Sequence, residues 1–323
     1  MKTTYFICLV VSFFMQCVPV EQEKQQQEKE TLPALQVTED ALHFYVLGDW
    51  GRNGQFSQQK VADIMEKSAY VIEPEMILST GDNFYDNGVG STQDYNWISS
   101  YEQIYSGQYT HCPWYVVLGN HDYRGNIQAE IDYTHISRRW NMPDRYYTKD
   151  FKSDDGATAT FVFIDTSPFE DDYYQEDKYK DVVAGQDTTA QIVWMDSVLS
   201  ASKADWRIVV GHHPLYSGGQ RLKKTANIQR HFDPIFKRNQ VDLYFAGHEH
   251  DLQHIKPVDG MTHHIISGAG SEVRPTGMMQ HSKFAKSVPG FVAASLTRDA
   301  ILLQFVDVDG TVIYTFNIKK DSD

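Results

Sequence analysis

Residues 43–51 read HFYVLGDWG, an apolar run of strand-forming residues that stops at a glycine and an aspartate. In open α/β sheets the carboxyl ends of the strands line the ligand crevice. A glycine at such an end lets the backbone turn sharply, so that the next side chain faces the crevice. An apolar run followed by Gly and then Asp, Asn or His occurs five times in the chain, at Gly48-Asp49, Gly81-Asp82, Gly119-Asn120, Gly211-His212 and Gly247-His248. This repetition predicts one polar site where several strands end.

Around these strand ends, the apolar residues alternate between the spacing of strands and that of helices. One helix is predicted over 58–69 after a candidate N-cap at Ser57, and a second over 192–199. Strands are predicted at 43–47, 76–78, 114–118, 161–164, 208–210, 241–245, 263–266, 290–296, 301–306 and 311–316. We therefore predict an α/β fold, a four-layer αββα sandwich of two mixed sheets with helices outside. We see no internal linker or repeat within 41–320, so this range is predicted to be one domain.

The composition is that of an ordinary globular chain. Of 323 residues, 41% are hydrophobic and 22% are charged, which excludes global disorder and a fibrous repeat. The net charge is −14 and no run of lysine and arginine occurs, so we expect no nucleic-acid partner. Phosphate binding by such a chain would need a local cationic source. With 13 histidines and 3 cysteines, metal chemistry is expected to use nitrogen and oxygen ligands.

Residues 1–20 are predicted to be an export signal, because Lys2 precedes an apolar stretch too short to span a membrane comfortably. A lipoprotein signal with attachment at Cys17, or an uncleaved anchor, is the alternative. Residues 21–40 are predicted to be a polar linker. The protein is thus expected to be exported and periplasmic, secreted or surface-anchored, with membrane contact only through an N-terminal lipid. Cys112 would then be the only cysteine of the folded part, which leaves no intrachain disulfide.

The side chains at the strand ends are hard oxygen and borderline nitrogen ligands. His248 and His250 point to the same side if their segment is extended. Tyr85 follows Asp82 closely, and a phenol with a free pKa of about 10 becomes a good ligand only for a strongly charged cation such as Fe(III). The sequence therefore predicts a two-metal site with a trivalent ion in one position, drawn from Asp49, Asp82, Tyr85, Asn120, His212, His248 and His250.

The motifs GDWG (48–51), GDNFY (81–85), GNHD (119–122), GHHP (211–214) and AGHEH (246–250) occur in the order and spacing of the calcineurin-like metallophosphoesterases. GDNFY makes the chain resemble the purple acid phosphatases. Residues 125–147, 247–255 and 267–270 are similar to the small tartrate-resistant, or type 5, form. The resemblance covers about residues 41 to 318, which includes nearly all of the predicted domain.

This resemblance implies a role for each matching residue. Fe(III) would be held by Asp49, Tyr85 and His250, and Asp82 would bridge both ions. A divalent Fe(II), Zn or Mn would be held by Asn120, His212 and His248. The implied reaction is hydrolysis of a phosphate monoester by a metal-bound hydroxide, as in an acid phosphatase. His121 would face the substrate and steady its charge or protonate the leaving group, with a mildly acidic optimum.

The chain departs from the small mammalian-like enzymes at Arg221, where they carry a second substrate-facing histidine. A guanidinium can bind phosphate but cannot donate a proton near neutral pH. His213, beside His212, is the other candidate for a catalytic role. The acidic, tyrosine-rich residues 170–181 are predicted to form an exposed loop, and the resemblance places them near a lid.

Two other functions remain open. The first is a metallophosphoesterase that acts on diesters or nucleotides. The protein-phosphatase and nuclease branches typically place a histidine where this chain has Gly51, and together with Tyr85 this disfavours them. The second is a non-catalytic surface binding module on the same fold, which the complete ligand set disfavours. We expect a small phosphomonoester or a phosphoprotein as substrate, and a monomer.

Overall fold

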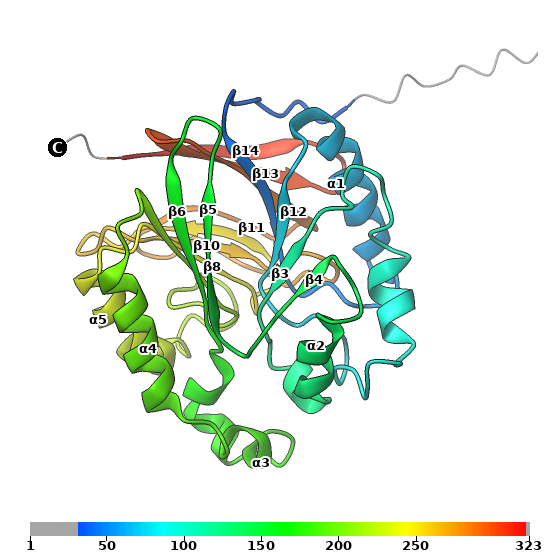
Figure 1. Cartoon of the computed structure of the whole chain (residues 1–323), viewed down its shortest axis with the longest axis vertical. Coiled ribbons are helices and arrows are strands. Elements are labelled where there is room, and N and C mark those ends of the chain that lie inside the picture. Colours follow the sequence, from blue (N-terminus) through cyan, green and yellow to red (C-terminus); the bar gives the residue numbers. More distant parts are fainter. Residues whose placement is uncertain (1–31, 321–323) are drawn as a thin grey trace, which may run out of the picture. The chain divides into compact units, whose positions relative to one another are not determined.

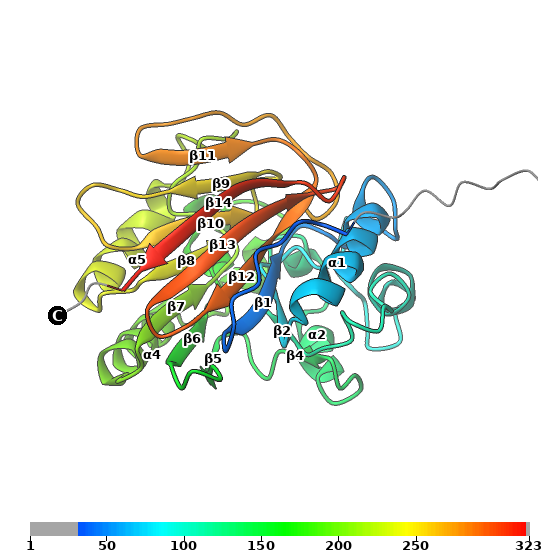
Figure 2. The same ribbon diagram turned by 90° about the horizontal axis from the view of Figure 1, so that it is seen from above.

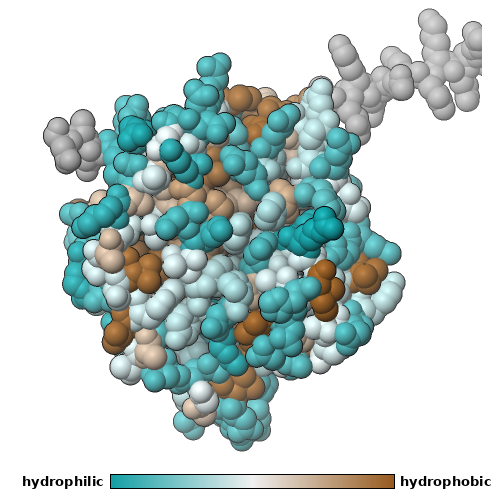
Figure 3. Space-filling model, in the orientation of Figure 1, coloured by the Kyte–Doolittle hydropathy of each residue, from teal (hydrophilic) through white to brown (hydrophobic). Residues whose placement is uncertain are grey.

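The computed structural model describes residues 32–320, and these residues form the body shown in Figure 1. The predicted signal (1–20) and the linker as far as residue 31 lie outside the described residues. Among the residues described, no helix is long and apolar enough to cross a membrane. On the face shown in Figure 3, apolar residues form small separate patches on a largely hydrophilic surface.

Two mixed β-sheets of seven strands each form the centre of the fold. The first has the order β14-β13-β12-β1-β2-β3-β4, and the second the order β11-β9-β10-β8-β7-β6-β5. The first sheet consists of β1 (Leu42–Leu47), β2 (Met76–Ser79), β3 (Trp114–Val116), β4 (Trp140–Asn141), β12 (Gly290–Leu296), β13 (Ala300–Asp307) and β14 (Val312–Lys319). The second consists of β5 (Tyr147–Lys152), β6 (Thr158–Phe163), β7 (Trp206–Val210), β8 (Leu243–Ala246), β9 (Leu252–Ile255), β10 (His263–Ser267) and β11 (Ser282–Lys286).

Helices cover the outer faces of the two sheets (Figures 1 and 2). The helices α1 (Gln58–Ile72) and α2 (Ile127–Tyr133) lie beside the first sheet, and α4 (Thr188–Ala201) and α5 (Ala226–Arg238) lie beside the second. Shorter helical turns are η1 (Trp97–Glu102), η2 (Asp122–Arg124), η3 (Ser167–Phe169), η4 (Asp171–Tyr174) and α3 (Lys180–Val183). The predicted four-layer αββα fold is therefore confirmed.

Alternate residues of the buried strands face different layers, as the two-residue period of a strand requires. On β7, Ile208 and Val210 belong to the core between the sheets, whereas Val209 packs with α4 and α5. The rings of Phe44 on β1 and Phe161 on β6 meet edge to face across that core, with centroids 5.6 Å apart. The strands that carry the site are thus buried on both faces and held firmly in place.

Each strand and helix predicted from the apolar spacing is present, with shifted ends. Ser57 does occupy the N-cap of α1, but its side chain makes no capping hydrogen bond. The prediction missed the short β4 and β9, the edge strands β5 and β11, and the helices α2 and α5. The edge strand β5 is largely exposed and β11 is half-buried, and both carry charged residues, so their sequences lack an apolar run.

Residues 32–40, which we expected to belong to the polar linker, pack against the domain. Leu35 is buried and belongs to the main hydrophobic core of the domain. The backbone N–H of Gln36 donates to the side chain of Gln304 at 2.7 Å, and the Gln304 amide donates back to the Gln36 carbonyl at 3.0 Å. The compact unit therefore begins at Leu32.

Candidate metal centre

Five loops bring the predicted ligands together, and each loop follows the carboxyl end of a strand. The loops after β1, β2 and β3 come from the first sheet, and those after β7 and β8 come from the second. All seven side chains are buried, from fully buried Asp49 and His212 to Tyr85 and His248, which are each 7% exposed. The site therefore lies where the ends of the two sheets meet.

The first group of donors surrounds the phenol oxygen of Tyr85. This oxygen lies 3.0 Å from Asp49 Oδ1, 2.9 Å from Asp82 Oδ2 and 3.1 Å from His250 Nε2. His250 Nε2 is also 3.3 Å from Asp49 Oδ1. Three oxygens and one nitrogen thus converge within the span of one coordination sphere.

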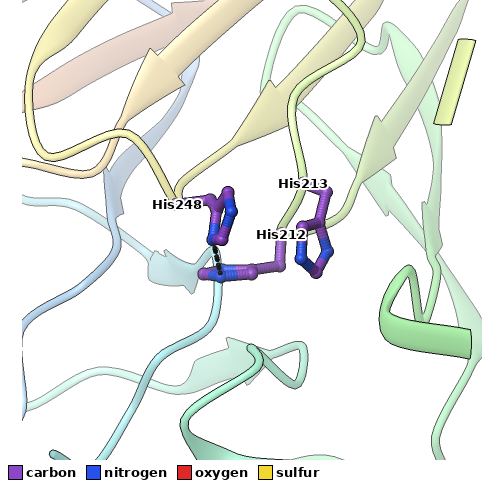
Figure 4. A group of neighbouring side chains, drawn as sticks. All are labelled: His212, His213 and His248. Atoms are coloured by element: carbon purple, nitrogen blue, oxygen red, sulfur yellow. Dashed lines mark hydrogen bonds between the residues drawn. The ribbon is translucent and has the colours of Figure 1, made fainter. Parts of the chain in front are cut away.

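The second group surrounds His212, whose ring faces that of His248 in Figure 4. His212 Nε2 lies 3.1 Å from His248 Nδ1, 3.3 Å from Asn120 Oδ1 and 3.5 Å from Asp82 Oδ1. Asp82 therefore contacts both groups, one through each carboxylate oxygen. This is the position that a bridging ligand would need.

Three of these residues have a left-handed backbone conformation, which is strained for a residue with a side chain. Their φ angles are 59° at Asp49, 51° at Asp82 and 68° at His248. Hydrogen bonds hold the strained turns in place: His248 N–H donates to Asp49 Oδ2 at 2.8 Å, and His121 N–H donates to Asp82 Oδ1 at 2.7 Å. A side chain at Gly119 would overlap the backbone of Asp82, so only glycine permits this close approach.

The donor chemistry of the site fits metal ions. His212 Nδ1 is 2.8 Å from the Thr80 carbonyl, which can only accept, so Nδ1 carries the hydrogen. The lone pair of Nε2 then faces the oxygens of Asn120 and Asp82, which are also acceptors. Within residues 32–320 the ion-pairing partners of Asp49 and Asp82 are histidines. Cations between these acceptors would satisfy all of them.

The pKa values of these groups reflect their burial. Burial raises the pKa of Asp49 to about 7, and burial together with the nearby carboxylates raises the pKa of Tyr85 well above its usual range. Burial would also raise the pKa of Asp82, but His212 and His121 hold it below its usual range. Burial lowers the pKa of His250 to about 3 and that of His248 far below its ordinary value. Both imidazoles are therefore neutral and have a lone pair for a metal.

Comparison with known families agrees with this geometry. The sequence profile of the calcineurin-like phosphoesterases matches residues 42–252. Purple acid phosphatase 17 of Arabidopsis thaliana is 34% identical over 334 aligned positions, which cover 99% of this chain and 96% of that protein. This chain belongs to the purple acid phosphatase branch of the calcineurin-like phosphoesterases.

Two further relatives resemble this purple acid phosphatase-like chain over most of its length. Human tartrate-resistant acid phosphatase type 5 is 29% identical over 87% of this chain and 91% of its own. The solved structure of GAP50, the anchor in the inner membrane complex of Plasmodium, superimposes with a TM-score of 0.75 at 29% identity. It covers 88% of this chain and 90% of that chain.

His121 of this phosphoesterase lies at the edge of the metal centre, and its role toward the substrate stays a prediction. Its Nδ1 lies 2.7 Å from the Asp86 carbonyl and 3.0 Å from Arg124 Nη1, and its Nε2 is 4.0 Å from Asp82 Oδ2. Burial lowers the pKa of His121 to about 4. Once the ring is protonated in acid, both ring nitrogens carry a hydrogen, and Nε2 could then donate one.

His213 and Arg221 line the same cavity but have protein partners. His213 Nδ1 lies 2.8 Å from the Thr166 hydroxyl, and its Nε2 lies 2.9 Å from the Tyr173 hydroxyl. Both ring nitrogens are therefore engaged, and the ring packs against that of His248 with centroids 4.3 Å apart. The Arg221 guanidinium lies 3.7 Å from the Glu249 carboxylate, which neutralises part of its charge.

A cavity of about 500 Å³ opens over the metal centre. The sequence analysis did not name Arg124 or Arg274 among its lining residues, and it expected Glu170, Tyr173 and Tyr179 only as part of the segment 170–181 near a lid. Residues 170–181, expected to form an exposed loop, are exposed only in part, because Tyr173 and Tyr179 are buried. The Tyr179 oxygen accepts from Asn120 Nδ2 at 2.9 Å and from Arg124 Nε and Nη2 at 2.9 and 2.6 Å.

Asp122 is a further residue that the sequence analysis missed, although it belongs to the motif at 119–122. Its buried carboxylate accepts hydrogen bonds from the backbone N–H groups of Gly119, Asn83 and Phe84 at 2.7 to 3.1 Å. It thereby joins the loop that carries Asp82 to the loop that carries Asn120. Its place in the motif was the available signal.

Proposed function

We propose that this chain is an acid phosphatase that hydrolyses phosphate monoesters at a dinuclear metal centre. One observation carries the proposal: the oxygens of Asp82 contact two groups of buried oxygen and nitrogen donors at the base of a cavity. Two cations placed a few ångströms apart are the arrangement that in-line phosphoryl displacement uses. Membership in the purple acid phosphatase branch supports the same reaction.

The two donor groups differ in a way that suits two different ions. Asp49, Tyr85, His250 and Asp82 would hold Fe(III), because a phenol ligand and two carboxylates favour a trivalent ion. Asn120, His212, His248 and Asp82 would hold a divalent Fe(II), Zn or Mn. When bound, these ions would neutralise phosphoryl oxygens and supply a water activated for attack on phosphorus. The assumed charges of the ions, +5, exceed the −3 of the two carboxylates and one phenolate, which gives the acidic chain its local cationic site.

The chain's own residues would orient the substrate and move its proton. Tyr179 fixes the Asn120 amide so that Oδ1 faces the second donor group. His121 Nε2 would protonate the leaving alkoxide, and its lowered pKa supports an acidic optimum. Arg221 and Arg274 at the cavity edge would attract the phosphate group. For Arg221 we retain a binding role, tested by lost activity in Arg221→Ala with unchanged metal content.

We further propose that the enzyme is an exported monomer that acts on small phosphomonoesters or phosphoproteins. The apolar start of the sequence supports export, whether cleaved or retained by a lipid at Cys17. The monomeric state stays a prediction. The net charge of −14 argues against a nucleic-acid partner.

The decisive experiment combines metal analysis, a visible spectrum and turnover of p-nitrophenyl phosphate, with a bis-ester as the competing substrate. We expect two metals per chain, a purple colour that Tyr85→Phe abolishes, and a preference for the monoester. Asp82→Asn should lose both metals and activity, whereas Asp309→Asn, on an exposed turn, should lose neither. Preferred hydrolysis of the bis-ester would show a diesterase instead, and full activity without metal would refute the proposal.

A second function deserves a test because GAP50, a relative over most of this chain, is an anchor in a membrane complex. Under this alternative the domain would act as a surface binding module, without turnover. The two functions can be told apart in a strain that lacks the native protein and carries only the variant Asp82→Asn. A phenotype restored by the inactive variant would favour the binding module, and failure to restore it would favour the phosphatase.

A further inference from the structure

Arg52 lies directly against the ring of Tyr85. The carbon at the centre of its guanidinium is 3.7 Å from the centroid of the Tyr85 ring and 4.9 Å from that of Phe56. Both distances are well within the range of an attractive contact between a cation and an aromatic face. Arg52 does not line the cavity over the metal centre, so it has no place among the substrate contacts.

The backbone around Gly51 forces this contact. The Tyr85 N–H donates to the Gly51 carbonyl at 2.9 Å and ties the two loops together. A side chain at position 51 would overlap the carbonyl oxygen of Asn83, so the approach requires glycine. Arg52 follows directly and therefore starts beside the Tyr85 ring.

The polar partners of the Arg52 guanidinium are consistent with its position over the Tyr85 ring. Its Nη2 donates to Glu272 at 3.0 Å, and its Nη1 lies 3.6 Å from the exposed Asp86 carboxylate. Its Nε is buried and has no hydrogen-bond partner among the described residues. A buried N–H without a partner is costly, and the ring face is what offsets this cost.

The Tyr85 side chain therefore meets opposite charges at different places. Its oxygen lies about 3 Å from the carboxylates of Asp49 and Asp82, while its face meets the Arg52 cation. A phenolate spreads its negative charge over the ring, so a cation on that face stabilises it. Arg52 on the ring face and the metal at the oxygen would thus both stabilise the negative charge of the Tyr85 phenolate.

From this geometry we infer that Arg52 is a positioning residue for the phenolate ligand. It holds the Tyr85 ring in place and compensates the phenolate charge, so that it tunes the bond between tyrosine and iron. This inference rests on the proposed function, because it requires a metal bound by Tyr85. It adds a residue outside the predicted ligand set that determines the properties of the centre.

The test uses the full chain and three variants. Arg52→Gln removes both the charge and the planar group. Arg52→Lys keeps a charge but cannot lie flat on the ring. The control Arg298→Gln removes one arginine charge from the turn before β13, at the end of the sheet opposite to the site. The readouts are the tyrosinate-to-iron absorption maximum and the rate at which a chelator removes iron.

Without the cation the phenolate becomes a better electron donor, so the absorption maximum of Arg52→Gln should move to longer wavelength. Because the Tyr85 ring also loses the contact that holds it in place, the iron of Arg52→Gln should leave on the order of tenfold faster, as expected for a partly desolvated cation–π contact. Arg52→Lys should give a smaller shift of the same sign, and the control should match the unmodified protein.

Two results would overturn the inference, and they can be told apart. If the unmodified protein is coloured but both Arg52 variants keep its absorption maximum and iron release, the inference alone is wrong. If the unmodified protein is colourless and holds no iron, the assignment of Fe(III) to Tyr85 is wrong, and the inference fails with it. Should Arg52→Gln not fold, the comparison of Arg52→Lys with the control decides.

Discussion

Replacement of Tyr179 by phenylalanine should weaken one metal position and leave the other intact. The Tyr179 oxygen accepts one hydrogen bond from Asn120 and two from Arg124, and no other partner of the Asn120 Nδ2 group is seen in residues 32–320. Its loss leaves the Asn120 amide free to rotate away from His212. It also leaves the Arg124 Nε without an acceptor.

The expected size follows from these contacts. An outer-shell residue of a metal ligand affects metal affinity by about 10- to 100-fold, which corresponds to about 1.4 to 2.7 kcal/mol. A loss of about 2 kcal/mol corresponds to an affinity roughly thirtyfold lower for the divalent ion. The absorption of the Tyr85 group should not change, because none of its donors contacts Tyr179.

The assay is a chelator titration that follows both metals, with the tyrosinate absorption as an internal reporter. Tyr174→Phe is the matched control, because it removes a hydroxyl from the same segment. Among the described residues, the Tyr174 hydroxyl makes one hydrogen bond, which it donates to the Pro168 carbonyl at 2.9 Å. Equal loss of both metals, or an unchanged divalent affinity, would refute the reasoning.

Three further predictions concern stability. Burial raises the pKa of Glu170 to about 7, against 4.5 for the free group. The contribution of Glu170 to the free energy of unfolding is therefore complete below pH 4.5 and is lost as the pH rises through 7. Above pH 7 the variant Glu170→Gln should be more stable than the unmodified protein by up to roughly 3 kcal/mol, as measured from urea unfolding midpoints. Gly51→Ala should lower the melting temperature and metal content together, because the new methyl overlaps the Asn83 carbonyl; normal values for both would contradict the packing. Removal of metal by a chelator should lower the melting temperature reversibly, since a ligand at 100 times its Kd stabilises by about 2.7 kcal/mol; scanning calorimetry before and after reloading would check this, and an unchanged melting temperature would argue against tight binding.

The strand ends were predictable because their signals are local. An apolar run, a glycine and a ligand residue are adjacent in the sequence, and parallel strands bring such ends to one edge. The same reasoning could not find Tyr179. It lies in an acidic segment with the composition of a solvated loop, and its burial depends on the distant Asn120 and Arg124. His213 shows the opposite case, since its place beside His212 suggested catalysis, whereas Thr166 and Tyr173 occupy its ring nitrogens.

Edge strands were missed for a related physical reason. β5 and β11 are paired on one side only and carry lysines, which suits an exposed edge and removes the apolar signal. The part of the fold that is most readily predicted from sequence is thus the set of buried strands with an apolar run, although the buried β9 was missed and the edge strand β14 was predicted. That part also carries the metal centre, which is why the site could be predicted better than the outline of the sheets.

The centre draws Asp49, Asp82, Tyr85 and Asn120 from one sheet, and its three histidines from the other. Within residues 32–320 the only cysteine, Cys112, is free, so no covalent bridge joins the two layers. A pair of metal ions bound by residues of both sheets would act as a reversible cross-link between them. The exported iron enzyme that we propose would be most rigid with both metals bound, and scarcity of iron would make it easier for proteases to attack.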